Sequence, residues 1–220
     1  MLDKMYDFIN RELIKYSLAI IEKSGKKLIA TKVSEGFDRN YIDDYICSCR
    51  QYIKGDVLEF NGDILYGENL EGVNLFKASY IDEKDKGSDY YFDIRNRETL
   101  PEKKFDCIIA TQVICYMLDG AEVLKNLKSM LREQGVLIIT NSGPIYQDNY
   151  EYEYETFYTK KGLERLCKSV FKDENVFNLK NYGDLEYSLY SLLGIKRMPN
   201  DKIVGGGNLS VIIGCCCKKT

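Results

Sequence analysis

The sequence predicts an α/β protein with an open, mostly parallel sheet of seven strands and helices on both of its faces. Short apolar runs alternate with segments of helical periodicity, a pattern typical of strands joined by helical crossovers. Two runs, 105–110 and 136–140, are almost entirely apolar, as expected for strands buried on both faces. At 220 residues, the chain is long enough for one domain with a substantial core.

Two helices are predicted before the first strand. Apolar side chains recur at steps of three to five over residues 2–22, and a second amphipathic helix is predicted over 39–53. Because no convincing strand precedes or separates them, we expect residues 1–54 to form an N-terminal helical cap. Residues 55–220 then form the main α/β domain, packed with the cap as one compact unit.

The remaining elements alternate along the rest of the chain. Strands are predicted over 56–60, 73–76, 90–94, 105–110, 136–140 and 209–213, and a further one begins at 176–177. Helices are predicted over 119–132, 160–171 and 184–193, with Thr159 as the N-cap of the second and Gln134-Gly135 ending the first.

The bulk composition disfavours two classes of partner. The formal net charge is -3 and the pI is near 5.3, whereas a protein that binds a phosphate backbone usually carries a basic excess. No apolar run approaches the roughly 20 residues that a membrane span needs, and the first 25 residues do not have the pattern of a signal peptide. We therefore expect a cytoplasmic protein that acts on neither nucleic acid nor membrane.

Histidine is absent and cysteine is frequent. The absence of histidine removes the side chain most often used as a general base and the commonest metal ligand. Eight cysteines include Cys47-Ser48-Cys49 and the triplet 215–217, which together could supply four thiolates to zinc. Their spacing does not match a zinc knuckle, so we predict free thiols in a reducing compartment and no metal site.

Polar side chains follow several of the predicted strands. In an open parallel sheet, ligands bind outside the carboxyl ends of the strands, near the point where the strand order reverses. Glu59 ends the first strand and is followed by Asn61-Gly62-Asp63, Asp93 ends the third, and Thr111-Gln112 end the fourth. These residues are the first candidates for a binding site.

Three blocks of the sequence resemble one enzyme family. Asp56-Val57-Leu58-Glu59, the strand 105–112, and the helix, turn and strand over 124–138 are similar to class I S-adenosylmethionine-dependent methyltransferases. The resemblance implies a Rossmann-like sheet. Segments 36–42 and 157–171 are similar to a bacterial branch of that family associated with glycosyltransferases.

The resemblance also implies a set of cofactor-binding residues. Glu59 matches the acid near the methionyl end of S-adenosylmethionine, Asp82 matches the acid that accepts from the ribose hydroxyls, and Asp93 with Ile94 matches the position that holds the adenine. Asn61, Gly62 and Asp63 match the loop after the first strand. Independently of the resemblance, Thr111 and Gln112 end a buried strand, where polar residues either cap the following segment or face a ligand, and we favour the ligand. Without the resemblance, Glu59 and Asp93 can be turn residues, and Asp82 lies in a charged stretch typical of a solvated loop.

The loop after Glu59 departs from the family pattern. Most family members have several glycines there, which let the backbone approach the cofactor closely. This chain keeps only Gly62 in the run Asn61–Leu65. The departure supports an alternative, a catalytically silent Rossmann-like subunit. A nicotinamide dehydrogenase is disfavoured because no G-x-G-x-x-G follows any strand.

A tyrosine-rich, acidic segment follows the fifth strand. Its position at the expected catalytic edge favours a lid, although its composition also suits an acidic surface loop. Tyr146, Asp148 and Glu151 are the candidate general bases in this histidine-free chain, with a lysine of lowered pKa as a further option. The predicted reaction moves a methyl group from S-adenosylmethionine to an oxygen or nitrogen of a small molecule, a sugar or natural-product intermediate, and releases S-adenosylhomocysteine.

Overall fold

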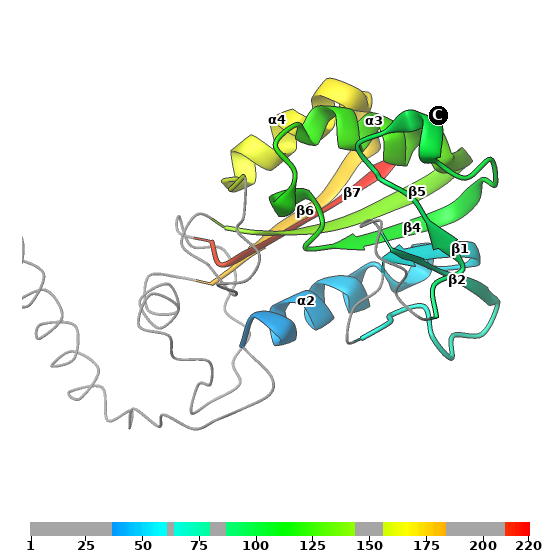
Figure 1. Ribbon diagram of the computed structural model, residues 1–220. Helices are drawn as coiled ribbons and strands as arrows, with labels where there is room; N and C mark the ends of the chain where they lie inside the picture. Colours follow the sequence, from blue (N-terminus) through cyan, green and yellow to red (C-terminus); the bar gives the residue numbers. More distant parts are fainter. Residues whose placement is uncertain (1–36, 61–63, 80–86, 144–155, 184–209) are drawn as a thin grey trace, which may run out of the picture.

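The structure, a computed structural model, describes residues 37–60, 64–79, 87–143, 156–183 and 210–220 (Figure 1). The helices are α2 (Phe37–Ser48), α3 (Gly120–Met130) and α4 (Lys160–Val170). The strands are β1 (Gly55–Phe60), β2 (Val73–Ser79), β3 (Tyr90–Tyr91), β4 (Phe105–Thr111), β5 (Leu131–Ser142), β6 (Val176–Tyr182) and β7 (Ile212–Lys218). The helices predicted over 2–22 and 184–193 lie outside the described residues.

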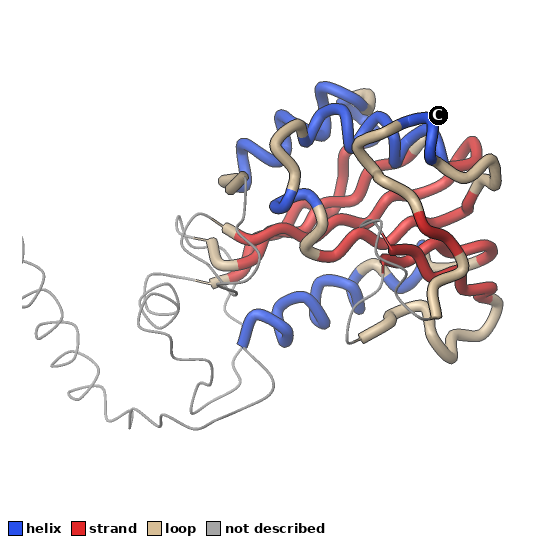
Figure 2. The backbone as a smooth tube through the Cα atoms, viewed as in Figure 1, coloured by secondary structure: helices blue, strands red, loops and turns tan. Residues whose placement is uncertain are grey.

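The seven strands form one sheet in the order β3-β2-β1-β4-β5-β7-β6. The strands run together through the middle of the molecule, with helices on either side of them (Figure 2). Neighbours from β3 to β5 are parallel, and β7 is antiparallel to both β5 and β6. The strand order reverses between β1 and β4, which lie side by side in the middle of the sheet. The predicted seven-stranded, mostly parallel sheet is confirmed.

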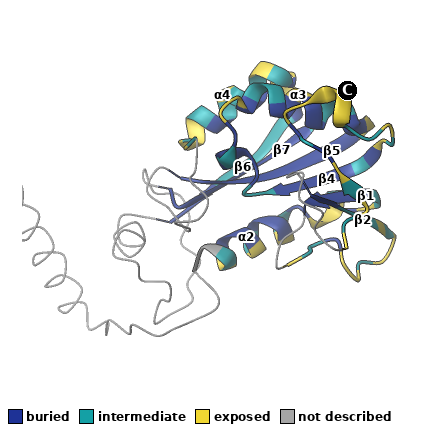
Figure 3. Cartoon of the chain, viewed as in Figure 1, coloured by how far each residue is buried: buried dark blue, intermediate teal, exposed yellow. Residues whose placement is uncertain are grey.

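Helices cover both faces of the sheet, with α3 and α4 on one side and α2 on the other (Figure 1). The central strands are buried between these layers (Figure 3). Consecutive residues of a strand project to opposite faces, so Ile108 joins the core under α3 and α4 while Ile109 joins the core under α2. This double burial explains the apolar runs of β4 and β5.

The helix predicted over 39–53 is shorter than expected and packs directly on the sheet. It ends at Ser48 and is followed by a 3₁₀ turn over Arg50–Tyr52. The ring of Tyr45 is fully buried against Gly214 of β7, and its hydroxyl lies 3.3 Å from the Cys216 sulfur and 3.1 Å from the carbonyl oxygen of Asn178. The proposed boundary at residue 54 stays a prediction.

Several predicted boundaries differ from the structure. The helix predicted over 119–132 ends at Met130, because Leu131 has an extended backbone and begins β5. Gln134 was predicted to end the helix but lies inside β5. It has a left-handed φ of 67°, at the place where the pairing of β5 with β4 shifts register. The third strand stops at Tyr91, before the turn that carries Asp93. The last strand begins at Ile212 rather than 209 and runs through the cysteine triplet.

No disulfide joins the eight cysteines, all of which lie in the described residues, and all but Cys47 are buried. Thr159 caps α4 as predicted, since its hydroxyl oxygen accepts the backbone N–H of Gly162 at 3.1 Å. No helix in the described part of the chain is long and apolar enough to cross a lipid bilayer.

Candidate functional site

The carboxyl ends of the five parallel strands meet at one edge of the sheet. Phe60 of β1 pairs with Ala78 of β2, which in turn pairs with Tyr90 of β3. On the other side, Thr111 of β4 pairs with Thr140 of β5. This register brings the ends of the strands, and the residues that follow them, to a common level around the point where the strand order reverses.

Glu59 is a buried carboxylate that holds the segment after β1. One of its oxygens accepts the backbone N–H of Tyr66 at 2.8 Å, and the other accepts that of Gly67 at 2.9 Å. Burial raises the pKa of the Glu59 carboxyl, and these two N–H groups oppose that shift. Glu59 thus fixes the position of the backbone at Tyr66 and Gly67, just after the glycine-poor loop.

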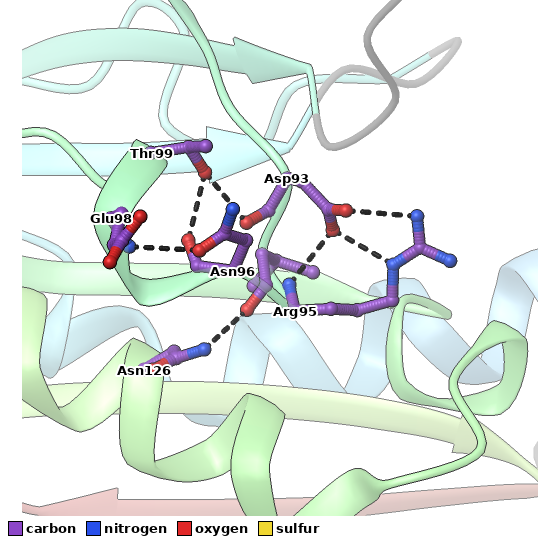
Figure 4. A network of polar contacts seen from close by, with 7 residues as sticks. Asp93, Arg95, Asn96, Glu98, Thr99 and Asn126 are labelled. Atoms are coloured by element: carbon purple, nitrogen blue, oxygen red, sulfur yellow. Dashed lines mark hydrogen bonds and ion pairs between the residues drawn. The ribbon is translucent and has the colours of Figure 1, made fainter.

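Asp93 begins a tightly tied turn after β3 (Figure 4). One oxygen of its carboxylate accepts from Nε of Arg95 at 2.8 Å and the other accepts from Nη2 at 2.9 Å, so the pair is bidentate. The Arg95 guanidinium lowers the pKa of the Asp93 carboxyl. Thr99 donates to the carbonyl oxygen of Asp93 at 2.9 Å and closes the turn.

Asn126 anchors the same turn from below (Figure 4). Its side chain is buried in α3 and donates from Nδ2 to the carbonyl oxygen of Ile94 at 2.7 Å. We did not predict this residue. A signal was present in the sequence, because Asn126 is a polar residue in the otherwise apolar stripe of Val123, Leu127 and Met130.

Gln112 joins the ends of β4 and β5. It has a left-handed φ of 55°, and its backbone N–H donates to the carbonyl oxygen of Thr140 at 2.9 Å. Its side-chain oxygen accepts from the hydroxyl of Ser142, and its side-chain nitrogen lies 3.3 Å from the hydroxyl oxygen of Thr140. Beside them, the buried Oδ1 of Asn141 has no hydrogen-bond partner among the described residues.

The structure thus brings part of the predicted site to one edge. Glu59, Asp93, Ile94, Thr111 and Gln112 lie at or just beyond the carboxyl ends of β1, β3 and β4. The other predicted residues lie outside the described part of the chain: Asn61, Gly62, Asp63, Asp82, Tyr146, Asp148 and Glu151.

A groove of about 760 Å³ lies at the opposite edge of the sheet. Its lining includes Gly55, Gly72 and Asp106, which precede or begin β1, β2 and β4. A ligand of an open parallel sheet binds at the carboxyl ends of the strands, so this groove is not the predicted site.

Comparison with known families identifies the central part of the chain. Residues 66–139, from the segment held by Glu59 to the middle of β5, match the family described as a methyltransferase domain. The chain carries a methyltransferase domain. The matched stretch begins after the glycine-poor loop, so it includes the Asp93 turn and Asn126 but not Glu59. The search of curated proteins found no match to this sequence.

Solved structures of methyltransferases share the fold at low sequence identity. A SAM-dependent methyltransferase from Archaeoglobus fulgidus is 14% identical, with a TM-score of 0.53, and the match covers 82% of this chain and 94% of that one. The plantazolicin methyltransferase BpumL, solved in complex with a triazolic desmethylPZN analog and SAH, is 15% identical, with a TM-score of 0.52 and coverage of 84% of both chains. The plantazolicin methyltransferase BamL, solved in complex with the same ligands, is 13% identical, with a TM-score of 0.53 and coverage of 83% and 84%.

The predicted family resemblance is confirmed at the level of the methyltransferase domain and its Rossmann-like fold. The protein is accordingly an enzyme of the methyltransferase class, and S-adenosylmethionine is the cofactor that such a domain implies. The comparisons do not bear on the branch associated with glycosyltransferases.

Proposed function

We propose that this methyltransferase transfers a methyl group from S-adenosylmethionine to an oxygen or nitrogen atom of a small molecule in the cytoplasm. The observation that carries the proposal is the polar edge of the sheet. Glu59, the Asp93 turn and Gln112 gather there from three strands, around the point where the strand order reverses. The acidic balance of the chain argues against a nucleic-acid substrate.

The described residues suit the adenosyl half of the cofactor. In the proposal, the Asp93 carboxylate accepts from the exocyclic amine of adenine, and Ile94 contributes its backbone beside the ring. The Asp93 carboxylate accepts three N–H groups of Arg95, so its second oxygen keeps one lone pair for such a donor. Asp82 would accept from the ribose hydroxyls, while Glu59, which accepts the backbone N–H groups of Tyr66 and Gly67, would lie near the methionyl end.

The cofactor supplies an electrophilic methyl group and leaves as S-adenosylhomocysteine. The protein's contribution is alignment, because holding the acceptor atom against the methyl carbon replaces a bimolecular encounter. An amine acceptor loses its proton to solvent, which suits a chain without histidine. For a hydroxyl acceptor, Tyr146, Asp148 or Glu151 would take the proton.

Calorimetry with S-adenosylmethionine, S-adenosylhomocysteine and NAD tests the proposal. We expect the first two to bind and NAD not to bind. Asp93→Asn should weaken binding at least about tenfold, since a charge-assisted hydrogen bond contributes roughly twice as much as a neutral one. Glu98→Gln, an exposed change in the same turn, is the matched control and should leave the affinity unchanged.

Two results would contradict this function. If neither S-adenosyl compound binds at millimolar concentration, the chain is a silent member of the fold. If Asp93→Asn and Glu98→Gln bind equally well, the adenine does not contact Asp93. If S-adenosylmethionine does bind, incorporation of its labelled methyl group into a panel of amine and hydroxyl acceptors distinguishes transfer to nitrogen from transfer to oxygen.

A further inference from the structure

Three buried thiols from two elements meet between α4 and β7. Cys167 belongs to the C-terminal half of α4, while Cys215 and Cys217 alternate along β7 and project from the same face of that strand. Their sulfur atoms all lie within 4.8 Å of one another, and all three residues are fully buried. Cys216, between the two, projects to the other face and lies 3.4 Å from the sulfur of Cys49.

The fold therefore changes the interpretation of the cysteine motifs. The triplet 215–217 cannot act as one ligand set, because its members are divided between the two faces of the sheet. Cys47 is exposed and does not join either group. Cys167, which lies far from both motifs in the sequence, supplies the third sulfur instead.

The chemistry of the cluster suits a soft metal ion. Thiolates prefer soft ions such as zinc and monovalent copper to hard ions such as magnesium and calcium. In the described part of the chain, no carboxylate joins the three sulfur atoms. Leu163 and Phe171 belong to the same buried core, so the surroundings are apolar.

Geometry and charge narrow the choice of ion. Metal–sulfur bonds of about 2.3 Å place the sulfurs of one zinc ion roughly 4 Å apart, within the observed limit of 4.8 Å. Three thiolates around a monovalent ion would bury two net negative charges, whereas a divalent ion leaves one. Since each buried charge costs several kcal/mol, the divalent ion is favoured.

We propose that Cys167, Cys215 and Cys217 form a binding site for one soft divalent metal ion, with Zn²⁺ as the expected occupant. On binding, three S–H groups release three protons to solvent and three metal–sulfur bonds form, without any change of oxidation state. The ion would tie α4 to β7 and so stabilise the half of the sheet formed by β5, β7 and β6. Because protons are released, affinity should increase as pH rises.

The full chain, reduced with a phosphine and freed of metal by a chelator, tests this site by titration with Zn²⁺ against a chromophoric competitor. We expect one equivalent to bind with a submicromolar Kd and to raise the unfolding temperature. Cd²⁺ should give the sulfur-to-metal charge-transfer absorption of three thiolates per ion. The proposal is wrong if the wild-type protein binds no zinc at micromolar concentration. It is also wrong if the charge-transfer absorption of the cadmium form corresponds to fewer than three thiolates per ion.

Two serine variants locate the ion on one face of the sheet. Cys167→Ser should bind Zn²⁺ at least about tenfold more weakly, because one of three metal–sulfur bonds is lost. Cys216→Ser, a neighbour on the opposite face, should keep the wild-type affinity. If Cys216→Ser weakens zinc binding and Cys167→Ser does not, the ion lies beside Cys49 on the opposite face instead. If Cys167→Ser does not fold, the cadmium band of the wild-type protein still decides.

Discussion

Single polar side chains, rather than large apolar ones, determine the shape of the proposed binding edge. Glu59 and Asn126 are both buried, and each makes its hydrogen bonds to backbone groups of a neighbouring segment. Through these bonds, each of the two side chains positions a loop. Their importance follows from the cost of leaving a buried backbone donor or acceptor without its partner.

Asn126→Leu tests this role at the scale of one residue. The change leaves the carbonyl oxygen of Ile94 without its donor, and we expect the free energy of unfolding to fall by about 1–3 kcal/mol. If Asn126 positions the Asp93 turn, the affinity for S-adenosylmethionine should also fall under conditions where the variant is fully folded. Lys125→Ala, an exposed change in the same helix, is the control and should alter neither quantity by much.

Denaturant titration measures the first effect and calorimetry the second. A stability loss with unchanged cofactor affinity would show that Asn126 supports only the core. Equal losses in both variants would show that α3 itself, rather than the bond to Ile94, is responsible.

Among the secondary-structure elements, the packing of α2 on β7 depends on a glycine. A Cβ atom at position 214 would lie 2.4 Å from the ring of Tyr45, which is fully buried and held through its hydroxyl. Gly214→Ala should therefore displace α2 and destabilise the protein by about 1–3 kcal/mol. Gly162→Ala, in the first turn of α4, meets its nearest neighbour at 3.2 Å and should change stability by less than about 1 kcal/mol.

Denaturant midpoints of the two alanine variants give the comparison. A loss in Gly162→Ala as large as that in Gly214→Ala would mean that helix packing against Tyr45 is not the cause.

The elements differ in how far the sequence could predict them. β4 and α4 were predicted almost to the residue, because an unbroken apolar run and a threonine cap are local signals. β7 was misplaced, because a run of cysteines has no strong strand signature, although small buried thiols fit between two layers of helices. The meeting of Cys167 with Cys215 and the anchoring of Ile94 by Asn126 depend on tertiary contacts that periodicity does not contain.

In the molecule as a whole, the two edges of the parallel sheet carry different kinds of side chain. The carboxyl edge gathers the polar residues of the proposed methyl-transfer site. The opposite edge carries a network of charges, in which Asp56 of β1 pairs with Lys103 at 2.9 Å and with Arg132 of β5 at 2.8 Å. Arg132 also pairs with Asp106 of β4, so the network links three central strands away from the site.

This network predicts how stability depends on pH. Hydrogen bonding to Lys103, then to Asn74 and Arg132, lowers the pKa of the Asp56 carboxyl from 3.8 to about 2. A carboxyl whose pKa is lower in the folded state contributes stability above its unfolded pKa, and that contribution is lost as pH falls through the folded value. The Asp56 contribution should therefore be complete above about pH 4 and disappear near pH 2.

Asp56→Asn should then be less stable than the wild type at pH 5, and the two unfolding free energies should converge as the pH approaches 2. Glu122→Gln breaks an exposed pair with Lys125 on α3 and should follow the wild-type curve throughout, because exposed pairs contribute little. Chemical unfolding at a series of pH values measures all three proteins. Parallel curves for Asp56→Asn and the wild type would mean that the charge of Asp56 does not stabilise the sheet. The expected result is that the unfolding free energy of Asp56→Asn converges with that of the wild type at low pH, while its cofactor affinity at neutral pH is unchanged. This result would show that the charged edge stabilises the sheet independently of the proposed methyl-transfer edge.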